Sequence, residues 1–426
     1  MCGGHFALAL GAMKTFLPAV LGAALMVLAH VPASKAAENT MPCDLGPLTN
    51  IPTVWALTPD KLEQLYPSPQ GAARNPFFTW LTADHSRAVF MRHRFTNVTI
   101  DLTILDKTIP VEEATVDFVG GKLNGISFSI YNRGDSGTVD LAELQRRSAK
   151  CNEALRKSLG VVPSPRHADP AQGLLTEGWT WISAQGMACL EYNPELEHGK
   201  PEYLRMRLAP RDARGAIAAS MRERRGGSTL SELAGSVKRN PQGDMWIEGV
   251  PMVDQGPKGY CVVASAQRLF EYFGISCDEH QLAQMAGSKA QGGTNTGEMM
   301  KALQSIDGSF KTQFKPLMLL YTDHSLRDPR SQKRADEKEF QKLVLEYTSK
   351  GIPLLWGLDL GKYPEEPPLK TQTGGGHMRL IIGCNPKTGQ LIFTDSWGAG
   401  HEMKRMKLSD AFEETHGLFA MQPTTH

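Results

Sequence analysis

Four residues in the C-terminal half of the chain have the types and the spacing that acyl transfer through a cysteine requires. Gln255 lies six positions before Cys261 in the stretch QGPKGYCVVASAQRLFEYFG, and His377 and Asp395 follow far downstream. In such chemistry a thiolate attacks the carbonyl carbon, an imidazole exchanges protons, and a third side chain fixes the tautomer and orientation of the ring. The glutamine amide would donate a hydrogen bond to the developing oxyanion.

Cys261 is predicted to begin a helix. Apolar residues recur after it at intervals of three and four, which places one face in a core: Val263, Ala266, Leu269, Phe270 and Phe273. The peptide dipoles and unsatisfied N–H groups of a helix N-terminus favour the thiolate, and the glycines of QGPKGYC let the backbone bend sharply before it. The helix alone leaves one alternative open, because a lone cysteine is more often a small buried hydrophobic residue.

The second stretch that could carry chemistry is predicted to be a β-hairpin. Two apolar runs, residues 378–383 and 391–394, flank the polar turn NPKTG. His377 precedes the first run and Asp395 follows the second. Antiparallel pairing brings those two ends together. The imidazole and the carboxylate are therefore expected to be neighbours, although they are 18 positions apart in the sequence.

These motifs resemble those of a known family. QGPKGYC resembles the glutamine-to-cysteine segment of the papain superfamily of cysteine peptidases, and DSWG resembles the NSWG of that superfamily, with aspartate in place of asparagine. The aspartate and the context GGGHMRLIIG are most similar to the branch of bacteriocin double-glycine leader peptidases. The resemblance implies that Cys261 is the nucleophile, His377 the general base and acid, Asp395 the orienting residue and Gln255 the oxyanion donor.

The resemblance also has consequences for the surroundings of the site. It implies that Trp397 shields His377 and Asp395 from water. Because the resembled proteases commonly use asparagine at the third position, Asp395→Asn is expected to retain partial activity. Lys258 and Val262 depart from the pattern, since papain-like proteases often carry a disulfide-bonded cysteine and usually a tryptophan there, so a papain-type subsite does not follow.

The predicted fold class is α+β in two domains. Residues 1–36, with Met13 as the expected start, have the apolar core and small residues of a secretory signal peptide. Residues 37–220 are predicted to form an N-terminal α+β domain, and the polar stretch 221–244 a linker. Residues 245–426 are expected to form a papain-like catalytic domain, in which an N-terminal helix carries the cysteine and an antiparallel sheet carries the histidine and aspartate.

Several elements can be placed by their sequence patterns. Strands are predicted in the first domain at Arg87–Arg92, Thr96–Leu105, Ala114–Val119, Ile126–Tyr131 and Trp179–Tyr192, and a helix at Leu141–Leu159. In the second domain a helix is predicted at Lys333–Thr348 and a strand at Leu354–Leu360. A strand-rich first domain indicates a substrate- or surface-binding role rather than that of a pro-segment, because papain-type pro-segments are largely helical.

Composition narrows the function further. The chain has 426 residues, 41% of them hydrophobic, and a net charge of +1, which argues against nucleic acid or an anionic membrane as the main partner. The loop NRGDSGTVDLAE resembles a calcium loop but lacks side-chain ligands at Gly134 and Ser136, and no histidine spacing indicates a metal. No cofactor is expected. After signal cleavage six cysteines remain: Cys43, Cys151, Cys189, Cys261, Cys277 and Cys384.

The sequence therefore predicts a secreted or periplasmic cysteine peptidase that acts on a peptide or protein substrate and keeps no membrane span after signal cleavage. Two alternatives stay open. An amidase acting on cell-wall peptides needs the same three side chains. A catalytically silent binding module would retain the papain-like fold without the reaction.

Overall fold

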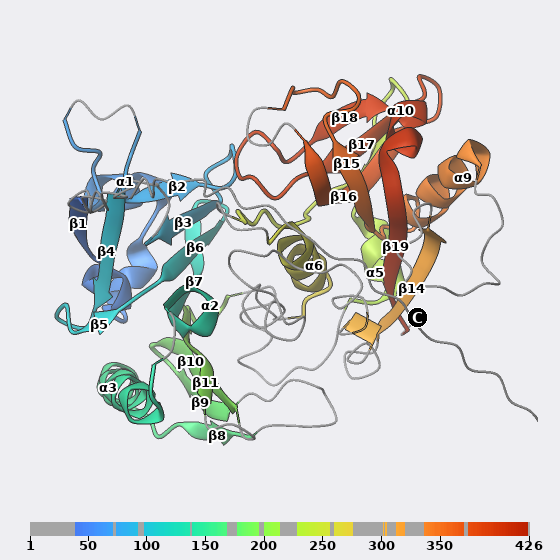
Figure 1. The fold of residues 1–426 in the computed structure, drawn as a ribbon. Helices are drawn as coiled ribbons and strands as arrows, with labels where there is room; N and C mark the ends of the chain where they lie inside the picture. Colours follow the sequence, from blue (N-terminus) through green and yellow to red (C-terminus); the bar gives the residue numbers. More distant parts are fainter. Residues whose placement is uncertain are drawn as a thin grey trace, which may run out of the picture. The chain divides into compact units, whose positions relative to one another are not determined.

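The computed structural model describes residues 39–70, 74–92, 98–136, 139–167, 177–195, 200–213, 228–255, 260–275, 301, 303–304, 312–319, 336–369 and 374–424. These residues form mixed α+β structure (Figure 1). The predicted signal peptide, the turn of residues 256–259 and Cys277 lie outside them. No described helix is long and apolar enough to cross a membrane.

One eight-stranded sheet is built from residues 78–209, with neighbouring strands antiparallel in the order β2-β3-β6-β7-β11-β10-β9-β8. Its strands are β2 (Phe78–Trp80), β3 (Arg87–Met91), β6 (Glu113–Val119), β7 (Lys122–Asn132), β8 (Ser164–Arg166), β9 (Glu177–Ser183), β10 (Gly186–Glu195) and β11 (Lys200–Ala209). The strands predicted at Ala114–Val119 and Ile126–Tyr131 are confirmed as parts of β6 and β7, which pair across a turn at Gly120 and Gly121. Both glycines have positive φ, 58° and 72°, which a tight turn requires.

A second, three-stranded sheet has the order β1-β4-β5. It contains β1 (Asn39–Asp44), β4 (Val98–Ile104) and β5 (Ile109–Pro110). The helical segments described before residue 160 are η1 (Gly46–Thr49), η2 (Thr53–Ala56), α1 (Pro59–Leu65), α2 (Arg133–Ser136) and α3 (Leu141–Leu159), of which α3 packs on β9, β10 and β11 of the eight-stranded sheet. The prediction of α3 is confirmed at both ends, because Asp140 caps it by accepting from the Glu143 N–H and Gly160 ends it in a left-handed conformation.

The C-terminal sheet has the order β12-β13-β16-β15-β19-β14, with β17 paired to β16 and β18 paired to β17. Its strands are β12 (Val237–Arg239), β13 (Met245–Ile247), β14 (Thr312–Leu319), β15 (Leu354–Leu360), β16 (Gly375–Asn385), β17 (Gln390–Thr394), β18 (Lys404–Lys407) and β19 (Thr415–Pro423). The predicted hairpin is confirmed as β16 and β17. The predicted strand at Leu354–Leu360 is confirmed as β15.

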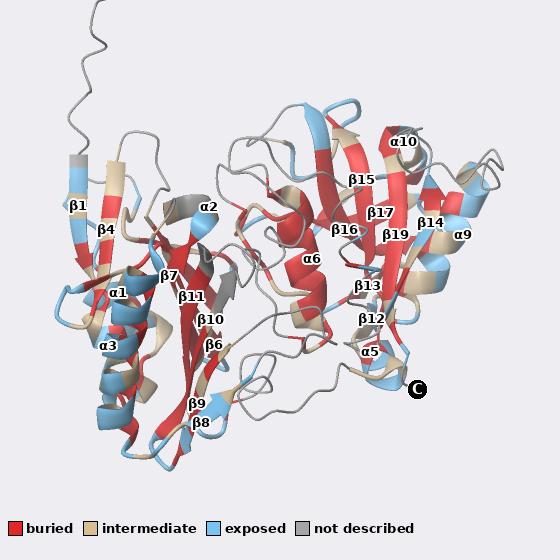
Figure 2. Cartoon of the chain, turned by 60° about the horizontal axis from the view of Figure 1, so that its bottom comes forward, coloured by how far each residue is buried: buried red, intermediate tan, exposed pale blue. Residues whose placement is uncertain are grey.

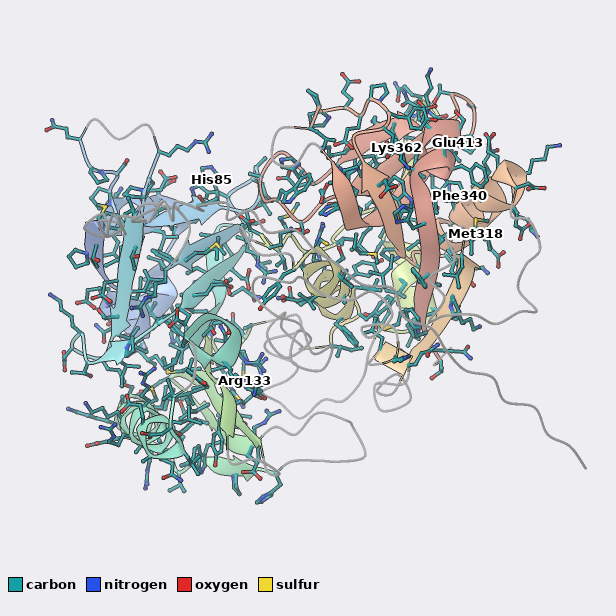
Figure 3. All side chains as sticks on the ribbon, in the orientation of Figure 1. His85, Arg133, Met318, Phe340, Lys362 and Glu413 are labelled. Atoms are coloured by element: carbon teal, nitrogen blue, oxygen red, sulfur yellow. The ribbon has the colours of Figure 1, made fainter. Side chains whose placement is uncertain are left out.

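Helices cover both faces of this sheet. They are α5 (Leu230–Gly235), α6 (Cys261–Tyr272), α9 (Glu337–Thr348) and α10 (Leu408–Glu414). Met378, Leu380 and Ile382 of β16 pack in one cluster with α6, whereas Ile381 packs in another with Phe340 of α9. Most of the length of these strands is coloured as buried in Figure 2, and Phe340 is labelled in Figure 3. Because successive side chains of β16 point to opposite faces of the sheet, this one strand contributes to both hydrophobic clusters.

Two further features bear on the sequence-based predictions. The stretch predicted as a linker contains α5 and β12, and β12 pairs with β13 of the C-terminal sheet. The domain boundaries stay a prediction.

Among the described cysteines all five are free: Cys43, Cys151, Cys189, Cys261 and Cys384.

Candidate active site

Cys261 is the first residue of α6, as the apolar periodicity predicts. Its N-cap, Tyr260, makes no side-chain capping hydrogen bond. The residues from Val262 to Phe270 are buried, whereas Cys261 is partly exposed. The thiol therefore lies at the end of a buried helix, where the peptide N–H groups of the first turn have no partners within the helix.

Two side chains fix α6 against the strands that carry the other candidate residues. Ser265 and Arg268 follow Cys261 by four and seven positions and so lie on the same side of the helix. The Ser265 hydroxyl donates to the Met378 carbonyl on β16 at 3.1 Å. Arg268 donates from Nη1 to the Asp395 carbonyl at 2.8 Å. The helix that presents the thiol is thus bonded to the backbone on both sides of the hairpin.

The hairpin brings His377 and Asp395 together, as predicted. Leu380 of β16 pairs with Thr394 of β17, so the strand ends that carry the two residues are adjacent. Nε2 of His377 lies 2.7 Å from Oδ1 of Asp395, and both side chains are buried. The backbone N–H of Ser396 donates to the same oxygen at 2.9 Å. The oxygen that contacts the ring is therefore also held by a backbone donor.

The pKa values of this pair are shifted in opposite directions. Burial alone would lower the pKa of His377, but the Asp395 carboxylate outweighs it and raises that pKa to about 9. Burial alone would raise the pKa of Asp395, but the Arg379 guanidinium and the His377 ring outweigh it and hold that pKa well below its usual range. At neutral pH the pair is thus an imidazolium and a carboxylate.

Cys261 lies near the His377 ring, whose other nitrogen is not used by Asp395. Nδ1 is buried and makes no hydrogen bond of ordinary length to another described residue. Cys261 is nevertheless close enough to contribute to the raised pKa of His377, after the larger effects of burial and Asp395. The ring therefore uses one nitrogen for the carboxylate and has the other available for proton exchange with sulfur.

Trp397 and Gln255 complete the predicted set. The indole of Trp397 stacks on the His377 ring, with centroids 4.6 Å apart and planes inclined by 20°. Gln255 joins the site through Ser396, because its backbone N–H donates to the Ser396 carbonyl at 3.0 Å and its Oε1 accepts from the Ser396 hydroxyl at 2.7 Å. Gly398, with φ of 78°, lets the chain turn directly after the indole.

Sequence reasoning missed a buried ionic network behind Asp395. Arg379 donates from Nε to Oδ2 of Asp395 at 2.7 Å and from Nη1 to Oε2 of Glu365 at 2.6 Å. Lys404 makes an ion pair with Glu365. A signal was present, because Arg379 is two residues beyond His377 on a strand and must lie on the same face. The signal for Glu365 and Lys404 was absent, since neither adjoins a motif.

Comparisons with known proteins agree with the position of this site. Residues 247–420 match the model of the Peptidase_C39 like family, which makes that segment similar to a cysteine peptidase-type family. The matched segment contains all five predicted site residues: Gln255, Cys261, His377, Asp395 and Trp397. No curated protein matches the chain. Among the described residues no group of three or more His, Cys, Asp or Glu side chains is arranged to hold a metal ion.

Proposed function

We propose that the chain is a cysteine peptidase that hydrolyses peptide or amide bonds through a thioester on Cys261. The observation that carries the proposal is the His377 ring, which is bonded through Nε2 to Asp395 at 2.7 Å and lies near enough to Cys261 for the thiol to contribute to its raised pKa. The similarity of residues 247–420 to cysteine peptidases supports the same reaction. In this proposal the arrangement of α6 against β16 and β17 is papain-like.

The proposed steps need only groups of this chain and water. Sγ of Cys261 attacks the carbonyl carbon of the scissile bond, and Gln255 donates to the oxyanion. His377 gives its proton to the leaving amine as the carbon–nitrogen bond breaks, which leaves a thioester. The neutral ring then takes a proton from water, which attacks the thioester and releases the acid and the thiolate. Asp395 keeps the ring oriented throughout, and Trp397 excludes water from the ion pair.

The approach of a substrate is supported by the start of β16. Gly375 and Gly376 are exposed, and the buried His377 follows directly. A Cβ atom placed on Gly376 would meet no atom within 4 Å. An extended substrate backbone can therefore reach the strand edge beside the ring without displacing a side chain. The aspartate and the GGGHMRLIIG context favour the double-glycine peptidase-like branch within this proposal.

The proposal includes export from the cytoplasm, which is supported by the signal-peptide features of residues 14–36. The amino-terminal sequence of the mature protein tests this part. Cleavage next to Ala36 is expected. A mature protein that retains the apolar stretch would contradict it.

Covalent labelling tests the catalytic proposal. An acylating, thiol-directed probe should label the wild type at Cys261 and should not label Cys261→Ala. Cys384→Ala is the matched control, because Cys384 is a free but buried cysteine of β16 and its loss should leave labelling unchanged. Hydrolysis of peptides and of cell-wall peptide fragments then separates a peptidase from an amidase. Full hydrolysis by Cys261→Ala would contradict the proposal.

A further inference from the structure

Both oxygens of the Asp395 carboxylate accept hydrogen bonds from buried donors. Oδ1 lies 2.7 Å from Nε2 of His377 and accepts from the Ser396 N–H at 2.9 Å. Oδ2 accepts from Nε of Arg379 at 2.7 Å. An ionised carboxylate suits this set, because it only accepts hydrogen bonds. The carboxylate group cannot rotate without breaking at least one of these bonds.

Arg379 itself cannot turn away from Asp395. Its guanidinium is fully buried and binds Glu365 through two parallel contacts, Nη1 to Oε2 at 2.6 Å and Nη2 to Oε1 at 3.1 Å. The ring of Phe393 lies 4.6 Å from the guanidinium carbon. Lys404, also fully buried, makes the next ion pair with Glu365. The charges therefore alternate from His377 to Lys404 in a region that excludes water.

An asparagine at position 395 would conflict with this arrangement. If its carbonyl oxygen faces His377 and Ser396, its NH₂ group meets the Nε–H of Arg379, and two donors oppose each other in a buried site. If the amide is reversed, the NH₂ group faces the Ser396 N–H and the ring nitrogen instead. Either orientation leaves a buried donor without an acceptor, which is costly.

We propose that Arg379 is a positioning residue that makes an aspartate obligatory at position 395. It fixes Oδ2, so that Oδ1 stays directed at His377. The inference deepens the proposed function and rests on it for its kinetic consequence. It also replaces the expectation, based on asparagine in the resembled proteases, that Asp395→Asn would retain partial activity.

A set of substitutions tests the donor conflict by rescue. Asp395→Asn should lose most of the kcat/KM for a small acyl substrate. Asp395→Asn/Arg379→Gln should have a kcat/KM at least about tenfold higher than that of the single variant. The glutamine oxygen can accept from the asparagine NH₂, and Glu365 keeps its ion pair with Lys404. Asp395→Asn/Arg379→Lys is the chemical control and should show no recovery, since a lysine only donates. A double variant with glutamine that is no faster than Asp395→Asn would overturn the proposal.

A second measurement separates this role from general support of the fold. Loss of the Arg379 charge removes a cation close to the Asp395 carboxylate, so the pKa of His377 should rise in Arg379→Gln relative to the wild type. Titration of the ring by NMR measures this without any substrate. If Arg379→Gln does not fold, Arg379→Met gives the same test, because it also lacks the donor.

The outcomes distinguish the two proposals. A wild type that hydrolyses no acyl substrate, together with a His377 pKa that rises in Arg379→Gln, contradicts the proposed function and supports the positioning role. An active wild type whose His377 pKa is the same in Arg379→Gln contradicts the positioning role and leaves the proposed function standing.

Discussion

His377 holds its proton far above the range of an ordinary imidazole, because the buried Asp395 carboxylate outweighs the effect of burial and raises its pKa to about 9. A cation therefore stands beside Cys261 at neutral pH. An anionic alkylating reagent should be attracted to it, whereas a neutral reagent of similar size should not. The ratio of the two alkylation rates at Cys261 is thus a direct measure of the charge on the ring.

We predict that iodoacetate reacts faster at Cys261, relative to iodoacetamide, below pH 9 than above it. The sign follows from the direction of the shift: the ring is charged below its raised pKa and loses the charge as pH rises through about 9. Added salt should reduce the preference, because it screens the attraction. Rates from mass spectrometry of the labelled peptide check this. A preference that changes near pH 6.5 would show that the Asp395 contact is not made in solution.

Arg268 shows at the scale of elements how one side chain holds α6 to the hairpin. It is almost fully buried and donates to the Pro251 carbonyl at 2.6 Å, the Asp395 carbonyl at 2.8 Å and the Thr394 hydroxyl at 2.5 Å. Burial lowers its pKa to about 10, so it stays charged at neutral pH. The helix of Cys261 and the loop of Asp395 are therefore positioned by the same guanidinium.

Arg268→Met should lower the free energy of unfolding by about 2–4 kcal/mol, because buried acceptors lose their donor. Arg146→Met on α3 is the control, since that side chain is 70% exposed and its loss should change the free energy of unfolding by less than about 0.5 kcal/mol. Urea unfolding measures both. Equal stability of the two variants would contradict the anchoring role of Arg268.

Substitution by alanine should destabilise the protein at one glycine of the GGGHMRLIIG stretch and not at another. A Cβ atom on Gly383 would lie 2.0 Å from the Met245 carbonyl oxygen, where β13 pairs with β16. A Cβ atom on Gly376 would meet nothing within 4 Å. Gly383→Ala should therefore destabilise the protein by about 2 kcal/mol or more, and Gly376→Ala should not. Thermal unfolding of both variants checks this. A stable Gly383→Ala would show that β13 does not approach β16 this closely.

Local pattern predicted several elements and few of their contacts. The bounds of α3 and β15 followed from the sequence pattern, and the adjacency of His377 and Asp395 followed from antiparallel pairing. The segment predicted as one strand at Trp179–Tyr192 is instead two paired strands, β9 and β10. Arg268 and Arg379 lie within apolar segments of the sequence, and the burial of each cation is explained only by its partners. Those partners, the carbonyls beside Asp395 and the carboxylate of Glu365, are set by the register of strands far apart in the sequence.

At the scale of the whole molecule, two features connect the chain beyond the predicted catalytic domain. β12 and α5 lie before residue 245 and yet belong to the C-terminal sheet and its cover. A shortened chain that starts at Ser228 should therefore be more stable than one that starts at Gln242. Unfolding midpoints of the two chains check this, and equal midpoints would support the linker that composition predicted.

The second feature is a half-buried ion cluster that joins β3 and β6 to α6. Arg87 contacts Glu271 of α6 at 2.7 Å and Asp117 of β6 at 3.2 Å. Burial raises the pKa of Asp117 despite the guanidinium. Burial would also raise the pKa of Glu271, but Arg87 outweighs it and lowers that pKa. One arginine therefore balances two carboxylates that would otherwise repel each other.

Arg87→Met should destabilise the protein by about 1–3 kcal/mol at pH 8, because the two half-buried carboxylates then lose the guanidinium that they share. The deficit should shrink as pH falls toward 5. Without Arg87 the pKa values of Asp117 and Glu271 rise in the folded state, so the folded state binds more protons than the unfolded state and is stabilised by acid.

Arg87→Met/Glu271→Gln should lose most of this pH dependence, since one charge is gone. Urea unfolding at the two pH values measures both variants, and a deficit for Arg87→Met that is equal at pH 5 and pH 8 would show that the cluster does not join these elements in solution.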